Sequence, residues 1–269
     1  MSTVPVLMYH HINPNRGDMV TVTPEVFEAQ MRHIKDAGYR TLTLDELLGV
    51  VSGRKLDDKG VVVTFDDGYL DNYVYAFPVL KKYGIKAAVF LVSSWVDKAT
   101  AAKGYQKRII SEFRERAPLH DQTKAYAQEG SFEKLSVNWD MVKEMKDSGL
   151  VEFHSHTVTH SRCDHLSGDE LKEELKLSKE AIEKALEKSC DYLCWPRGKY
   201  NDEGVGAARE LGYRGVFTTE PGVAGAGADP FRIKRIVVKD RVRWFKTRLT
   251  VYTNGLLSGL YMKMSGKGR

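Results

Sequence analysis

The chain has 269 residues and a formal net charge of +5, with 42% hydrophobic and 29% charged residues. These values are typical of a soluble globular protein and exclude a disordered chain, a collagen-like repeat and a membrane protein with several spans. The positive charge lies at one end, because residues 241–269 contain seven lysines and arginines and no acidic residue. Removing those seven from the 41 basic residues leaves 34 against 36 acidic ones, a net charge of −2, for residues 1–240. We expect no nucleic-acid partner for this protein.

Strands and helices are predicted to alternate along the chain. Apolar runs typical of buried strands occur at 4–8, 61–65, 87–92, 151–153, 192–195 and 215–218, followed by an extended segment at 231–238. Helices are predicted at 24–37, after the capping box at 43–46, at 73–83 and 139–148, after the capping box at 167–170, and at 203–211. About seven such units predict an α/β fold with a closed or nearly closed parallel barrel; an open doubly wound sheet is the alternative.

Two segments depart from this alternation. Residues 97–137 are polar and mixed in charge, and we expect an excursion of helix and loop that walls one side of the barrel rim. Residues 241–269 are expected to form a basic amphipathic C-terminal extension outside the catalytic barrel of residues 1–240.

Reactive residues follow four of the predicted strands. They are the Tyr-His-His sequence at 9–11, the Asp-Asp-Gly sequence at 66–68, three histidines between 154 and 160, and Pro-Arg-Gly at 196–198. A parallel barrel builds its active site at the C-terminal ends of its strands, so these clusters are expected to meet at one rim. Alternation directs only one of His10 and His11 toward the barrel centre.

The histidines and aspartates have the composition of a metal site. His156 and His160 are four residues apart and can face one ion on a helical or tightly turned segment. A carboxylate from Asp66 or Asp67 completes a set of two histidines and one acid that leaves positions open for water and substrate. Adjacent side chains diverge, so one aspartate can bind metal while the other acts as a base.

Each motif also has a more ordinary interpretation when taken alone. Asp-Asp-Gly is most often a turn, and two histidines four apart most often lie on a solvated helix face. His154 is either a further ligand or a neighbour of the ligands, whereas His120, like His33 and His165, is expected at the surface.

The motifs in this order resemble those of the polysaccharide deacetylases, carbohydrate esterase family 4. The resemblance rests on residues 64–68 (Thr-Phe-Asp-Asp-Gly), 156–160 (His-Thr-Val-Thr-His) and 195–198 (Trp-Pro-Arg-Gly), with Tyr200 and Asn201. Residues 5–10 and 230–236 are similar to the subgroup that contains the poly-N-acetylglucosamine deacetylases. The resemblance covers about residues 4–238.

This resemblance implies a distorted (β/α)7 barrel and metal-dependent removal of an N-acetyl group from a sugar. It implies a divalent metal ion, most often zinc, held by Asp67, His156 and His160. It further implies Asp66 as the general base and the backbone N–H of Arg197 as a donor to the oxyanion. The proton donor to the leaving amine would be His10.

Three departures from the family pattern affect these roles. Arg197 stands where members commonly have an aromatic residue, and Cys194 stands where many carry an arginine that orients the base, so Arg235 is the candidate replacement. The late Leu-x-x-x-His acid motif is absent, because no histidine follows His165.

The same groups would also serve an O-deacetylase or a small-amide hydrolase. A non-catalytic carbohydrate-binding relative is a further alternative, against which the intact Asp-Asp and His-x-x-x-His motifs argue.

The C-terminal extension leads to the expectations about location. The chain shows no leader sequence and only three cysteines, which favours the cytoplasm. The 14 uncharged residues from Leu249 to Met262 are too few to span a bilayer. The extension either lies at the inner membrane surface or packs on the barrel exterior as one or two helices. The expected substrate is an N-acetylated glycan, or a lipid-linked sugar if the membrane alternative holds.

Overall fold

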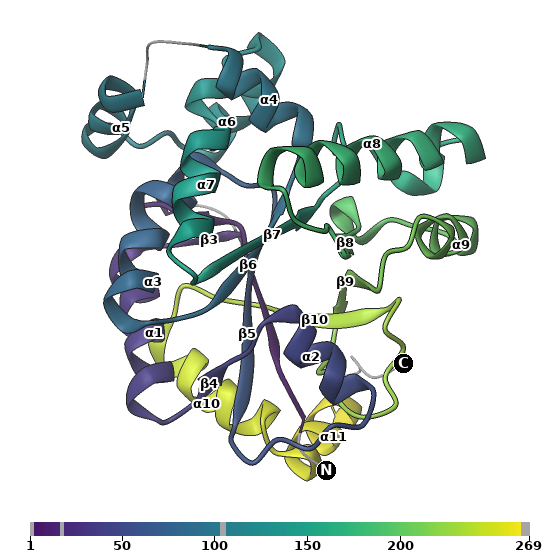
Figure 1. The fold of residues 1–269 in the computed structure, drawn as a ribbon. Helices are drawn as coiled ribbons and strands as arrows, with labels where there is room; N and C mark the ends of the chain where they lie inside the picture. The colour runs from purple at the N-terminus through teal and green to yellow at the C-terminus, as the bar shows by residue number, and fades with distance from the viewer. Residues whose placement is uncertain (1–2, 17–18, 103–105, 265–269) are drawn as a thin grey trace.

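The computed structural model describes residues 3–16, 19–102 and 106–264. Its centre is a closed ring of parallel strands (Figure 1). The ring contains β1 (Val6–Tyr9), β5 (Gly60–Phe65), β6 (Ala87–Leu91), β7 (Val151–Ser155), β8 (Tyr192–Cys194), β9 (Gly215–Pro221) and β10 (Ile233–Val237). It closes because β1 pairs with both β5 and β10. The predicted (β/α)7 barrel is therefore confirmed.

Three short strands lie outside the ring. β4 (Arg40–Thr41) extends the sheet beside β5, and β2 (His11–Ile12) pairs with β3 (Thr21–Val22).

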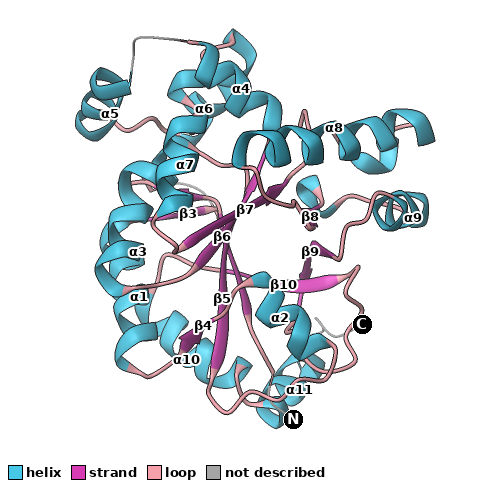
Figure 2. Cartoon of the chain, in the orientation of Figure 1, coloured by secondary structure: helices cyan, strands magenta, loops and turns pink. Residues whose placement is uncertain are grey.

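Helices surround the strands on the outside (Figure 2). They are α1 (Pro24–Asp36), α2 (Leu44–Val51), α3 (Phe77–Tyr83), α4 (Ser93–Ala101), α5 (Gln106–Glu115), α6 (His120–Glu129), α7 (Trp139–Asp147), α8 (Gly168–Leu186), α9 (Asp202–Glu210), α10 (Val242–Tyr252) and α11 (Gly255–Met264). The capping box before α2 forms as predicted, because Thr43 Oγ1 accepts from the Glu46 N–H and the Glu46 carboxylate accepts from the Thr43 N–H. The helix expected at 73–83 is divided into a π-helical turn, Asn72–Ala76, and α3.

The N-terminal half of the barrel interior is an apolar core. Side chains two residues apart on each strand face inward, and Val6, Val62, Phe90, Phe217 and Ile233 form one buried cluster there. The buried face of α2 belongs to the same cluster through Leu44, Leu47, Val50 and Val51. This end of the barrel is thus filled by packing, which leaves the C-terminal end for polar groups.

The predicted excursion at 97–137 folds mainly into the end of α4, α5 and α6, and into a short 3₁₀ turn at Phe132–Lys134. In Figure 1 these helices gather at the top of the molecule, away from the chain's N-terminus. The excursion therefore rises on the side of the barrel where the strands end.

The C-terminal extension begins with α10, which packs against α1 and buries Phe245, Leu249 and Tyr252. The Thr3 hydroxyl donates a hydrogen bond of 2.7 Å to the Tyr252 carbonyl, just before β1 begins. α10 therefore ends at the N-terminal side of the barrel, where α11 follows (Figure 1). Leu256 of α11 is 87% exposed. Within the described ranges, no helix is both long enough and apolar enough to cross a membrane.

Candidate active site

The turn after β5 brings two adjacent carboxylates to one site. Asp66 continues the strand, since its N–H donates to the Tyr9 carbonyl. Asp67 and Gly68 then adopt left-handed backbone conformations, with φ of 71° and 69°. A Cβ at Gly68 would lie 2.6 Å from Leu91 Cδ2, so only glycine fits there without a shift of Leu91. The reversal lets both aspartates line the same pocket.

Asp67, His156 and His160 converge on one point. Asp67 Oδ1 lies 3.3 Å from His156 Nε2 and 3.2 Å from His160 Nε2. It is buried and has no hydrogen-bond partner of good geometry in the described part of the chain. His156 Nδ1 lies 2.7 Å from the Cys194 carbonyl, an arrangement in which Nδ1 carries the proton and the Nε2 lone pair faces Asp67. One carboxylate and two imidazoles in this arrangement fit a divalent metal such as zinc.

The electrostatics of this group keep the aspartate charged. Burial raises the pKa of Asp67, but the two imidazoles lower it further, so the pKa lies well below its ordinary value. An ionised carboxylate is the form that binds a cation.

Asp66 is held by an arginine from the last strand of the barrel. Arg235 is fully buried, and its Nη1 and Nη2 each donate to one Asp66 carboxylate oxygen at 2.7 Å. Its Nε donates to the Thr218 carbonyl, and Nη2 lies 3.0 Å from Cys194 Sγ. Burial raises the pKa of Asp66, but the charge and hydrogen bonds of Arg235 bring it below its ordinary value. Arg235 thus lies where it can orient the Asp66 carboxylate, the role for which Cys194 is unsuited.

A second group of potential ligands consists of Asp66, His156 and Cys194. Arg235 bonds to both the carboxylate and the sulfur of this group, and its positive charge disfavours a cation there. Burial also raises the pKa of the Cys194 thiol, so the sulfur keeps its proton. Asp67, His156 and His160 are therefore the better metal site.

His10 and His11 face different surroundings, as alternation predicts. His10 Nε2 lies 3.7 Å from Asp66 Oδ2, whereas His11 Nδ1 lies 2.6 Å from the buried carboxylate of Asp71. Burial lowers the pKa of His10, and the nearby Asp66 and Asp67 only partly oppose that effect. His10 is the member of the pair that reaches the carboxylates.

His154 lies one inward position below His156 on β7 and is not part of the metal-binding group that the described residues form. Its Nε2 is 3.5 Å from the Glu152 carboxylate, and its ring meets the Tyr192 ring edge-on. Of the two interpretations of His154, the structure therefore favours a neighbour of the ligands.

Backbone strain gathers at this rim. Within the described chain, five non-glycine residues have positive φ, and four of them lie in the loops after β5, β7 and β8: Asp67, Thr157, His160 and Arg197. Such conformations cost about 1–3 kcal/mol each and persist where the surrounding structure fixes them. Arg197, with φ of 57°, lies in the short turn Pro196–Gly198 and lines the same pocket as the aspartates.

The pocket that contains these groups has a volume of about 580 Å³. Its other wall comes from Tyr69, Trp95 and the face of α6 that bears His120 and Lys124. His120 was expected at the surface but lines this pocket, and no local pattern in the sequence indicates Tyr69, Trp95 or Lys124 as wall residues. The spacing of the α6 residues could indicate a shared helix face, but not the direction in which that face points.

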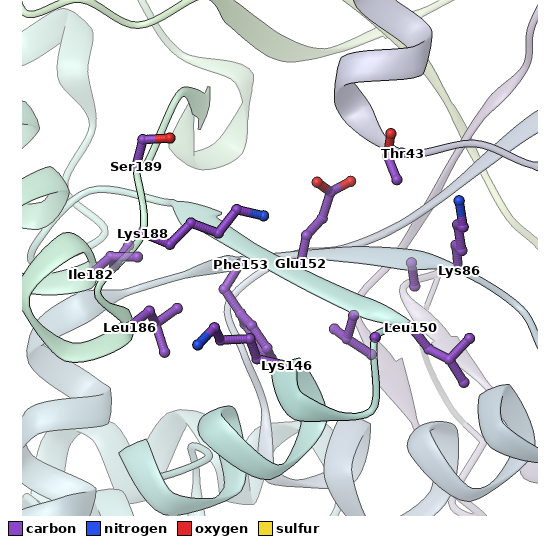
Figure 3. Close-up of a pocket in the computed structure, with 13 residues that line it drawn as sticks. Thr43, Lys86, Lys146, Leu150, Glu152, Phe153, Ile182, Leu186, Lys188 and Ser189 are labelled. Atoms are coloured by element: carbon purple, nitrogen blue, oxygen red, sulfur yellow. The ribbon is translucent and has the colours of Figure 1, made fainter.

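A different cavity lies at the opposite end of the barrel (Figure 3). Glu152 points into it from β7, and Lys86, Lys146 and Lys188 also line it. The Glu152 carboxylate accepts the Leu44 N–H at 2.7 Å, which stabilises the start of α2. Glu152 therefore has a structural partner, and this cavity lacks the paired aspartates and histidines.

Comparisons with known proteins agree with this geometry. A family model described as polysaccharide deacetylase matches residues 53–216. The YxkH protein of Bacillus subtilis (strain 168) is 32% identical over 236 residues, which cover 87% of this chain and 71% of that protein. The poly-beta-1,6-N-acetyl-D-glucosamine N-deacetylase of Escherichia coli (strain K12) is 25% identical over 82% of this chain. The matched part is about a third (34%) of that protein's length.

Among solved structures, the Streptococcus pyogenes deacetylase PplD in complex with acetate matches with a TM-score of 0.75 and 26% identity. The match covers 94% of this chain and 98% of that one. The family model alone spans more than half of the 269 residues. The chain belongs to the polysaccharide deacetylase family.

Proposed function

We propose that this protein is a metal-dependent hydrolase that removes the acetyl group from an N-acetylated sugar in a glycan. One observation supports the proposal above all. A single pocket contains three residues that can bind a metal ion and, separately, Asp66, whose carboxylate is held by the buried Arg235. The names of similar proteins support an N-acetylated sugar, since several are N-deacetylases of poly-beta-1,6-N-acetyl-D-glucosamine.

Asp67, His156 and His160 would hold the ion, for which zinc is our proposal. A divalent ion there would polarise the acetamide carbonyl and lower the pKa of a bound water toward about 7.

Asp66 would take the proton from the attacking water while Arg235 fixes the orientation of its carboxylate. As the water oxygen forms its bond to the carbonyl carbon, the backbone N–H of Arg197 would donate to the developing oxyanion. The carbon–nitrogen bond then breaks, giving acetate and a free amine on the sugar.

His10 would deliver the proton that the leaving amine needs. Since burial lowers its pKa, His10 is mostly neutral in the resting site and must first gain a proton. Asp66, which would have taken a proton from the attacking water, lies 3.7 Å from His10. We propose that the proton passes from Asp66 through His10 to the amine, so that the site returns to its starting charge.

The position of the C-terminal extension bears on the choice between a glycan and a lipid-linked sugar. α11 lies at the N-terminal side of the barrel, whereas the pocket lies at the C-terminal ends of the strands. A membrane against α11 would therefore not bring the pocket toward that membrane. We propose a glycan chain as the substrate. A cytoplasmic location, and contact of the extension with the inner membrane face, remain predictions.

The test is release of amine from N-acetylglucosamine oligosaccharides by the full chain, before and after chelation and with added Zn²⁺. We expect chelation to abolish amine release and Zn²⁺ to restore it. Amine release that survives exhaustive chelation, with metal analysis confirming removal, would overturn metal dependence. Release of acetate only from O-acetylated sugars would overturn the N-deacetylase assignment.

A further inference from the structure

The exposed charged residues that line the active-site pocket share one sign. Among the described residues that line it, the exposed charged side chains are Lys124 of α6 and Arg197, both positive. The two lining carboxylates, Asp66 and Asp67, are buried and face Arg235 and the two ligand histidines. A substrate entering the pocket therefore meets cationic groups first.

Lys124 belongs to one consistent face of α6. The pocket residues of this helix are spaced by three or four positions: His120, Thr123, Lys124, Ala127 and Gln128. The acidic residues of α6, Asp121 and Glu129, are not among them. The Lys124 ammonium lies 3.2 Å from the Asp121 carboxylate, which is 92% exposed. Such a solvent-exposed pair contributes little, so Lys124 can exchange it for a substrate anion.

Arg197 comes from a different part of the chain, the turn after β8. Its left-handed backbone fixes the position from which the side chain leaves the turn. No carboxylate of the described residues lies within ion-pairing distance of its guanidinium, whereas the exposed Arg40, Arg214 and Arg232 each have such a partner. A guanidinium offers paired donors that match the oxygens of a phosphate or a carboxylate.

We propose that the glycan substrate carries an anionic group, a phosphate or a carboxylate, close to the N-acetylated sugar, and that Lys124 and Arg197 bind it. This inference rests on the proposed deacetylase function and specifies its substrate class. The buried carboxylates remain available for metal binding and proton transfer, while the exposed cations select the substrate.

The experiment compares three N-acetylglucosamine oligosaccharides of equal length. One is neutral, one carries a phosphomonoester, and one contains a uronic acid carboxylate. We expect kcat/KM to be higher for an anionic substrate than for the neutral one, and this preference to shrink as salt is raised. The phosphate and carboxylate arms identify which anion the pocket takes.

Substitutions of Lys124 and Arg197 then test whether these two residues cause the preference for an anionic substrate. We expect Lys124→Gln to lower the ratio of anionic to neutral kcat/KM by roughly two- to fivefold, through KM. Arg197→Gln should lower the same ratio, with partial recovery in Arg197→Lys. The matched control is Lys176→Gln on the outer face of α8, 60% exposed and paired with Glu180, which should leave the ratio unchanged.

Binding to the Asp66→Asn variant, measured by calorimetry, gives a readout without turnover. Equal affinity of that variant for neutral and anionic oligosaccharides would overturn the inference, as would an unchanged ratio in both Lys124→Gln and Arg197→Gln. The proposed function would stand in either case, provided that the neutral substrate is deacetylated. Absence of amine release from all three substrates, with metal bound, would instead count against the proposed function.

Discussion

The two halves of the barrel interior differ in chemistry although the same strands form both. On β5 the inward position at Val62 belongs to the apolar cluster, whereas Asp66, four residues on, binds Arg235. On β10 the apolar Ile233 is followed two residues later by Arg235. Strand alternation thus gives both β5 and β10 an inward residue that packs in the apolar cluster, followed two or four residues later by an inward charged residue at the site. Stability and activity should therefore be separable by changing residues on the same strand.

The largest expected effect comes from substitutions at the polar end of the barrel interior. It distinguishes Asp66, the proposed base, from the proposed metal ligands. Asp66→Asn should lower kcat by about 10²–10⁴-fold because the proton acceptor is lost, yet it should keep the metal. His156→Ala should lose both the metal and turnover. Amine-release kinetics with metal analysis of each purified variant checks the difference. A near-normal rate for Asp66→Asn would show that another group is the base.

His10 is the next position to test. His10→Gln should lower kcat by roughly 10²-fold with metal content unchanged, because the leaving amine loses its proton donor. Rates for substrates with better leaving groups should fall less. An unchanged rate for the amide would remove His10 from the reaction.

Arg235 lies where the two halves meet, so its loss should affect both properties. Arg235→Met leaves the Asp66 carboxylate buried without its partner, which should cost about 3–5 kcal/mol of unfolding free energy. In the native protein the pKa of Asp66 is lowered, so its contribution to stability is present above the ordinary carboxyl pKa and is lost as pH falls through the lowered value.

In Arg235→Met, burial acts without Arg235 and raises the pKa of Asp66. The acid limb of the pH–rate profile should therefore move to higher pH. Urea unfolding and a pH series of kcat/KM check the two effects. An acid limb that stays in place would mean that Arg235 does not set the charge of Asp66.

Phe217 tests the apolar half. Its ring is fully buried in the interior cluster beside Phe90, so Phe217→Ala should cost about 3–5 kcal/mol through lost contacts and a cavity. At temperatures where the variant stays folded, kcat should remain within about twofold of the parent. A large loss of kcat in folded protein would show that the two halves are not separable.

The smallest effect is expected at Glu152, at the end of the barrel far from the pocket. Glu152→Gln keeps an acceptor for the Leu44 N–H but removes the charge at the start of α2, so we expect a loss of about 0.5–1 kcal/mol. Thermal unfolding measures this loss, and the amine-release rate should not change. A loss of activity would link this end of the barrel to the site.

Local sequence was sufficient where a feature depends on neighbouring residues. The sequence predicts a buried strand from the β-branched run at 61–65 and a helix start from the capping box at 43–46. It also indicates that His156 and His160, four residues apart, can face one point. The barrel class follows from the alternation of predicted strands and helices. The left-handed backbone of Asp67 explains how adjacent aspartates reach one pocket, which strand alternation alone would not predict.

Long-range contacts were harder to predict. Arg235 and Asp66 are 169 residues apart, and the pairing of Arg235 with Asp66 was suggested by the resemblance rather than by any local pattern. Likewise, the excursion was expected to wall the rim, but nothing near His120 or Lys124 shows that these two residues face the pocket, because that depends on how the whole excursion packs.

The closure of the ring has a consequence for how the enzyme is made. β1 is the first strand of the ring in chain order, and it pairs with β10, the last, which leaves the ribosome after every other strand of the ring. Asp66 therefore has no counter-charge until Arg235 has been translated. A product that terminates before β10 leaves the ring open and Asp66 without Arg235, so we expect it to misfold and to lack activity. Synthesis of the last strand of the ring is therefore required before Asp66 and Arg235 can pair.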